Sequence, residues 1–122
     1  MPTLTEVNLE IAVRDGVDDN STVQFKLYHG SESNVIAYYD ANVIGSEAPW
    51  RHPLRMYNPL DKSQLNETTF YMEINAKGHD SFNGHLILNF VFSDGSKSAF
   101  DYGDFSIGTY RESNTTRKAI QV

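Results

Sequence analysis

The sequence contains no cysteine. A disulfide framework, a thiolate metal site and a cysteine nucleophile are therefore all excluded. Long apolar runs are also missing, since no stretch approaches the length of about 20 apolar residues that a transmembrane helix requires. The first ten residues, MPTLTEVNLE, lack the basic and the apolar regions of a signal peptide. From these features we expect a soluble protein, and the sequence leaves its compartment open.

Positive charge is scarce: the sequence has 10 Lys and Arg residues and 16 Asp and Glu residues, which gives a formal net charge of -6. Nucleic-acid binding depends on cations that contact phosphates, so this balance argues against DNA or RNA as a partner. It also argues against binding to, or insertion into, anionic membranes. Catalytic motifs are missing too: there is no G-x-S-x-G elbow and no phosphate-cradling glycine loop before a helix. We therefore expect a non-enzyme.

Aromatic residues are plentiful and, together with Val, Ile and Thr, favour β-structure. The clearest element begins at Gly84, where apolar side chains recur at every second position, as a strand requires: Leu86, Leu88, Phe90 and Phe92. Ile87 and Val91 place apolar groups on the opposite face, which predicts a strand near the centre of a sheet. Asp94-Gly95 then predicts a type I′ hairpin turn, with residues 97–102 as the return strand.

Alternating patterns predict further strands at residues 6–14, 22–28, 35–39, 54–57, 68–76 and 105–110, with a tail at 117–122 that adds a last strand or frays. The first two either form a hairpin or belong to opposite sheets. Asp61 is the predicted N-cap of one helical turn within residues 60–66, and residues 101–104 are predicted to form an acidic turn. About eight short strands without a major helix predict an all-β domain over residues 1–122, an antiparallel β-sandwich of the jelly-roll type.

The segment around Trp50, the only tryptophan, is the candidate ligand-binding site. Its neighbours supply hydrogen-bonding groups: Arg51, His52, Arg55 and Tyr57. A flat ring beside such groups suits a carbohydrate, because the ring covers the apolar face of the sugar while the polar groups bind its hydroxyls. Trp, Tyr and Arg are equally enriched at protein-binding hot spots. The structural alternative is that Trp50 fills the sandwich core or packs under an arginine.

The Tyr38-Tyr39 pair invites the same interpretation as Trp50. Tyrosines with an apolar body and a polar tip also line sandwich edges without any ligand. The pair is therefore a weaker indication of binding than the tryptophan segment.

An acidic loop after the first expected strand is the candidate metal site: Asp15, Asp18, Asp19 and Asn20. Ca²⁺ takes about six to eight oxygen ligands, and loops at one end of a sandwich can supply them. Depending on topology, further carboxylates could come from the same end: Asp80, Asp101 and Asp104. The spacing is not that of an EF-hand, and a solvated turn is the alternative because turns favour Asp, Asn and Gly in any case. His79 and His85 provide too few ligands for a zinc site.

In outline the chain resembles lectin-like and C2-like or PLAT-like β-sandwiches, which share short strands, acidic end loops and aromatic loop residues. The likeness is one of class, and no residue roles follow from it. Two functions are predicted. The first is a non-catalytic binding module for carbohydrate, assisted by Ca²⁺. The second is a structural or protein-interaction subunit of a fibre, capsid or toxin assembly, in which a sheet edge or exposed aromatics bind a partner chain or another copy.

Overall fold

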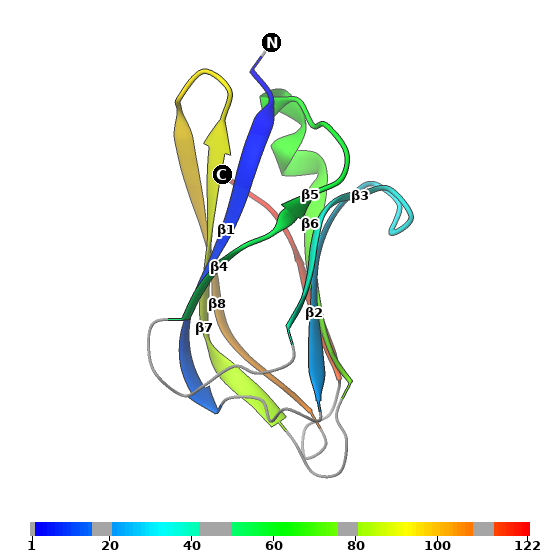
Figure 1. Ribbon diagram of the computed structural model, residues 1–122, viewed down its shortest axis with the longest axis vertical. Coiled ribbons are helices and arrows are strands. Elements are labelled where there is room, and N and C mark those ends of the chain that lie inside the picture. Colours follow the sequence, from blue (N-terminus) through cyan, green and yellow to red (C-terminus); the bar gives the residue numbers. More distant parts are fainter. Residues whose placement is uncertain (1, 16–20, 42–49, 76–80, 109–113) are drawn as a thin grey trace.

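The computed structural model describes residues 2–15, 21–41, 50–75, 81–108 and 114–122. Within these residues, nine strands form two antiparallel sheets that face each other (Figure 1). The first sheet has the order β4-β1-β7-β8 and consists of β1 (Leu4–Asp15), β4 (Trp50–Pro53), β7 (Ser81–Phe92) and β8 (Lys97–Gly108). The second has the order β5-β3-β2-β6-β9 and consists of β2 (Thr22–His29), β3 (Val35–Ala41), β5 (Arg55–Met56), β6 (Thr68–Asn75) and β9 (Thr115–Ala119). The predicted all-β sandwich is confirmed.

The central strand β7 has the predicted alternation. Every second residue from Phe82 to Phe92 is buried between the sheets, whereas Ile87 and Val91 are half-buried on the outer face. The strand lies between β1 and β8, in the interior of its sheet. The two-sided apolar pattern therefore identified an interior strand correctly.

The hairpin between β7 and β8 has a different turn from the one predicted. Gly95 has a φ of 84°, but no described residue other than glycine has a positive φ, so Asp94 cannot occupy a type I′ turn. The Gly95 amide donates to the Phe92 carbonyl at 2.9 Å, and the Phe92 amide donates to the Ser96 carbonyl at 3.0 Å. This is a three-residue loop, a type I turn followed by a left-handed glycine. The Asp94 carboxylate accepts the Ser96 amide at 2.9 Å, which holds the loop in this form.

The acidic turn predicted at residues 101–104 is wrong, because these residues lie within β8. The strand pairs with β7 from Lys97 to Gly108, with one register shift between Leu86 and Ile87. A bulge lets the strand bend and continue where the Asp and Gly residues suggested an end. The strand predicted at residues 105–110 is thus the second half of β8 as far as Gly108.

The chain changes sheets at Leu54, between two short edge strands. The edge strand predicted at residues 54–57 is present as β5, and β4 comes immediately before it in the other sheet. The predicted helical turn is the 3-10 helix η1 (Lys62–Glu67), with Asp61 at its N-cap. The strands β1 and β2, whose relation the sequence left open, belong to opposite sheets. In the described part of the chain, no helix has the length and apolar character needed to cross a membrane.

Candidate functional site

Strand β4 presents its two sides to different parts of the surface. Arg51 and Pro53 are exposed on the outer side of the four-stranded sheet. Trp50 and His52 are half-buried and turn toward the second sheet, because successive side chains of a strand point to opposite faces. Two depressions in the described surface adjoin this strand, one on each side.

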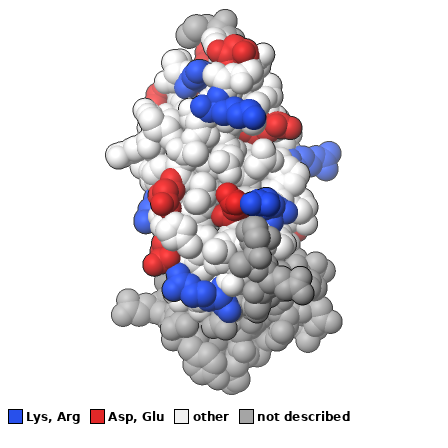
Figure 2. Space-filling view, turned by 90° about the vertical axis from the view of Figure 1, so that its left-hand side faces the viewer, with Lys and Arg blue, Asp and Glu red and all other residues white. Residues whose placement is uncertain are grey.

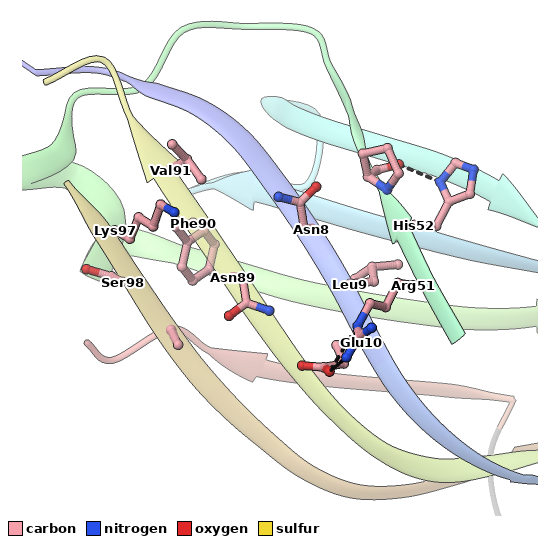
Figure 3. A pocket seen from close by; sticks show the side chains of 12 residues that line it. Asn8, Leu9, Glu10, Arg51, His52, Asn89, Phe90, Val91, Lys97 and Ser98 are labelled. Atoms are coloured by element: carbon pink, nitrogen blue, oxygen red, sulfur yellow. Dashed lines mark hydrogen bonds and ion pairs between the residues drawn. The ribbon is translucent and has the colours of Figure 1, made fainter. Parts of the chain in front are cut away.

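The first depression, which we call the sheet-face depression, is shallow, open and about 660 Å³ in volume (Figure 3). It crosses the outer face of the four-stranded sheet and is lined by polar side chains from all four strands: Asn8, Glu10, Arg51, Asn89 and Lys97. Glu10 and Arg51 are cross-strand partners, and the Arg51 Nε and Nη2 both donate to the Glu10 Oε1, at 3.1 and 2.7 Å. The guanidinium of Arg51 is therefore held beside Glu10 of the neighbouring strand.

Two amides lie side by side at the centre of this depression. Asn8 and Asn89 are direct partners in the β1–β7 register, and both are half-buried. Within the described residues, neither side-chain amide has a hydrogen-bond partner, so donors and acceptors of both face the open depression. An amide can both donate and accept, which is the combination that a hydroxyl requires.

The second depression, which we call the edge groove, is about 490 Å³ in volume and lies where the chain passes from β4 to β5. It is lined by residues from three strands and the segment after them: Tyr38, Tyr39, Asp40, His52, Pro53, Leu54, Arg55 and Tyr57. Rings dominate its walls. Tyr39 and His52 stack with centroids 3.8 Å apart, and Tyr38 meets Tyr57 edge-on at 6.3 Å. The edge groove thus combines aromatic surfaces with charged and phenolic groups.

Tyr57 is the most accessible ring of the edge groove, with 53% of its surface exposed. The Arg55 guanidinium lies 5.6 Å from the centre of this ring, within cation–π range. Arg55 reaches this position because it pairs with Tyr38 in the β3–β5 register. Rings and charge therefore come together through strand pairing, not only through closeness in sequence.

Hydrogen bonds hold two polar groups of the edge groove in place. The Tyr38 hydroxyl donates to Asp40 Oδ1 at 2.8 Å; burial first, and then this bond, raises the pKa of Tyr38 to about 12. The phenol therefore stays protonated at physiological pH. His52 Nδ1 lies 2.6 Å from the Pro53 carbonyl oxygen. Since a carbonyl can only accept, Nδ1 is the nitrogen that donates in this bond.

The structure divides the residues predicted to bind a ligand. His52, Arg55 and Tyr57 meet in the edge groove, whereas Arg51 lies on the sheet face. Trp50 lines neither depression: its ring packs on the core and stacks on Phe25 at a centroid distance of 5.8 Å. This placement agrees with the structural alternative stated for Trp50.

Several residues of the two depressions were not singled out from the sequence as a set. Asn8 and Asn89 are 81 positions apart in the sequence, and only the register of β1 and β7 brings them together. The signal that both face outward was available, because each stands between apolar residues in an alternating strand. The sequence gives no comparable signal for which strands are neighbours in the sheet.

The candidate calcium residues Asp18, Asp19 and Asn20 lie outside the described residues, and Asp15 is the last residue of β1. Asp80 also lies outside them. Among the described residues, no group of three or more His, Asp or Glu side chains could hold a metal ion. The calcium site stays a prediction.

Asp101 and Asp104, which were candidate calcium ligands, instead bind His85 on the outer face of β7 and β8. His85 Nδ1 lies 2.9 Å from Asp104 Oδ1, and Nε2 lies 2.6 Å from Asp101 Oδ1. Arg14 donates to the same Asp104 oxygen at 2.8 Å. Two carboxylates facing both ring nitrogens favour the doubly protonated imidazolium.

We expect this cluster to make stability depend on pH. The hydrogen bonds with Asp104 and then Asp101 raise the pKa of His85 above its ordinary 6.5. When the pKa of a group is higher in the folded than in the unfolded protein, the group stabilises the fold fully at any pH below its unfolded-state pKa. This stabilisation is lost as the pH rises through the folded-state pKa. His85→Gln should therefore be less stable than the wild type in mildly acidic solution, and the difference should shrink at alkaline pH. Urea unfolding of both proteins across this range measures the effect.

The matched control for this pH dependence is His29→Gln, since within the described residues the His29 ring faces one carboxylate, that of Glu67, with an Nε2–Oε1 distance of 3.7 Å. Its pH profile should follow that of the wild type more closely than the profile of His85→Gln does. The explanation is wrong if His85→Gln and the wild type lose stability in parallel as the pH rises.

Comparisons of the chain with protein-family models, curated proteins and solved structures found no match. The residues and geometry of the two depressions therefore provide the evidence for function. Of these, the edge groove has the stronger resemblance to a ligand site, because stacked rings, a guanidinium and a carboxylate converge in it.

Figure 2 views the side of the molecule formed by the four-stranded sheet, where positive and negative side chains alternate and no large patch of one sign is visible.

Proposed function

We propose that the protein is a non-catalytic carbohydrate-binding module that holds its ligand in the edge groove. The observation that carries this proposal is the convergence of rings with a cation and a carboxylate in one open groove: Tyr38, Tyr39, His52, Tyr57, Arg55 and Asp40. A sugar has apolar C–H faces and a rim of hydroxyls. Aromatic rings cover the faces, and polar side chains bind the rim.

The polar groups of the edge groove favour an uncharged sugar. Arg55 can only donate hydrogen bonds and the Asp40 carboxylate can only accept them, whereas a hydroxyl does both. A carboxylated or sulfated sugar would have to approach Asp40, and a cationic ligand would have to approach Arg55. Positive and negative side chains also alternate over the neighbouring sheet face, which shows no large patch of one sign for a strongly charged polymer (Figure 2).

We expect Tyr57→Ala to weaken binding of a neutral saccharide by at least tenfold, about 1.4 kcal/mol. The substitution removes the most exposed ring of the edge groove and the surface on which Arg55 rests. Binding is measured by isothermal titration calorimetry with the tightest ligand found in a panel of neutral oligosaccharides. Because Tyr57 is 53% exposed, its truncation should change the free energy of unfolding by no more than about 0.5 kcal/mol.

The matched control is Tyr71→Ala, which removes a half-buried tyrosine from β6, on the outer face of the same five-stranded sheet but outside the lining of the edge groove. It should leave the saccharide affinity unchanged. Equal affinity of Tyr57→Ala and the wild type would contradict the proposed site. Failure of the wild type to bind any member of the panel would overturn the proposal in favour of the interaction-subunit hypothesis.

The calcium dependence predicted from the acidic loop can be measured in the same titrations. If Ca²⁺ assists binding, EDTA should weaken the saccharide affinity of the wild type, and added Ca²⁺ should restore it. An Asp18→Asn variant should then bind as weakly as the wild type in EDTA. Identical affinity in EDTA and in Ca²⁺ would remove calcium from the proposal and leave the edge groove as the site.

A further inference from the structure

We infer that the ligand is a saccharide chain that runs from the edge groove across β4 onto the sheet-face depression. This inference rests on the proposed function, and it adds a second binding region and a ligand length. The two depressions adjoin at His52 and Pro53, which line both. Since β4 is an edge strand of its sheet, a chain bound at the edge groove can pass over it.

The sheet-face depression has the groups that a second sugar needs. The paired amides of Asn8 and Asn89 stand at its centre, and both can donate and accept hydrogen bonds. Val91 and Ala99 lie on the same outward face and provide apolar surface beside them. Polar side chains beside a partly apolar floor are the same combination that the edge groove presents.

Two of the three described Lys, Arg, Asp and Glu side chains that line the sheet-face depression compensate each other, and the third is Lys97, at its β8 end. Arg51 and Glu10 neutralise each other, with Arg51 donating two hydrogen bonds to one carboxylate oxygen. The pair lies beside the amides, two residues further along β1 than Asn8 (Figure 3), so it is placed to contact the flank of a chain that crosses the sheet. The compensation favours a neutral chain, in agreement with the edge groove.

The dimensions of the sheet agree with a chain of several sugars. Adjacent strands are about 4.8 Å apart, so the four strands from β4 to β8 span about 14 Å. The depression extends over this width, from Arg51 on β4 to Lys97 and Ala99 on β8. This length exceeds one sugar ring, and the edge groove adds room for at least one more.

The test is a chain-length series. Mono- to hexasaccharides of cello-, xylo-, manno- and malto-oligosaccharides are titrated into the wild type and into the double variant Asn8→Ala/Asn89→Ala. For the wild type, affinity should rise with chain length. The double variant should bind the longest members roughly fivefold to tenfold more weakly and the shortest members with unchanged affinity.

Two variants control for indirect effects. Asn75→Ala removes an exposed amide from the end of β6, away from the lining of both depressions, and should leave affinity unchanged for every length. Asn8→Ser/Asn89→Ser keeps a smaller polar group at each position, and it replaces the alanine variant if thermal melts show that the latter is unfolded.

The outcomes separate this inference from the proposed function. Affinity that depends on Tyr57 but not on chain length, or that the amide variants do not change, would overturn the extended site and leave the edge groove intact. Binding that depends on the two amides but not on Tyr57 would contradict the proposed site in the edge groove, and with it this inference. If no series binds, both fall.

Discussion

Phe25→Ala should lower the free energy of unfolding by about 3–5 kcal/mol, the largest loss we expect from a single side chain. The ring has no exposed surface and lies at the junction of the two sheets. From β2 it faces Phe70 on β6 of its own sheet at 6.4 Å, and Phe82 and Trp50 of the other sheet at 6.5 and 5.8 Å. Truncation leaves a cavity that these rings cannot all close. Urea unfolding followed by circular dichroism measures the loss.

The effect should reach the edge groove as well. Trp50 stacks on Phe25 and also on His52, with centroids 5.8 Å apart in both pairs. Loss of the Phe25 ring removes one support of Trp50, so we expect the saccharide affinity of a folded Phe25→Leu variant to fall along with its stability. The control is Tyr57→Ala, which should lower affinity with little effect on stability.

A loss of unfolding free energy below about 1.5 kcal/mol for Phe25→Ala would mean that this aromatic cluster does not hold the two sheets together.

Gly84→Ala is the second substitution from which we expect a large effect, about 3 kcal/mol or more. A Cβ at this position would lie 2.5 Å from the Ala12 carbonyl oxygen and 3.2 Å from the Val13 Cα. Both contacts are with the backbone of β1, which cannot move aside as a flexible side chain would. The β1–β7 pairing shifts register next to this point, between Val13 and Asp15. Relieving the clash would therefore require separating two central strands.

The control for Gly84→Ala is Asn89→Ala in the same strand. Asn89 is half-buried on the outer face, and the structure predicts a change within about 0.5 kcal/mol for its truncation. The comparison uses denaturant unfolding of both variants and the wild type. If Gly84→Ala unfolds at the same urea concentration as Asn89→Ala, the close approach of the β1 and β7 backbones does not affect stability and the prediction is wrong.

Much of the fold could be predicted because strand faces are a local property. The period of two along residues 6–14 and 84–92 identified β1 and β7 together with their buried sides, since alternate side chains of any strand point to opposite faces. The turn between β7 and β8 was predicted in place but not in type. Asp-Gly is compatible with more than one hairpin loop, and the bonds of Phe92 with Gly95 and Ser96 select the three-residue form.

Sheet order and register could not be predicted, because they depend on contacts between distant residues. Nothing near residue 101 in the sequence shows that β8 continues past Gly103, since continuation depends on hydrogen bonds with β7. Likewise, the assignment of β1 and β2 to opposite sheets depends on the packing of the whole core.

The candidate site was predicted in part for the same reason. His52, Arg55 and Tyr57 are close in sequence, and the passage from β4 to β5 keeps them together in space. Tyr38 joins them only through its pairing with Arg55 across β3 and β5. Trp50 precedes His52 by two positions and therefore shares its inward-facing side, where the core covers the larger ring.

The most direct test of the central claim is to map saccharide binding by ¹H–¹⁵N correlation spectra of the labelled wild type. Spectra are recorded during titration with the tightest-binding member of the oligosaccharide panel. We predict that the largest shift changes cluster at the edge groove, at the amides of Tyr38, Tyr39, His52, Arg55 and Tyr57. Changes confined to β6 and β9, on the far side of the five-stranded sheet, or no change at the highest concentration of any panel member, would contradict the account.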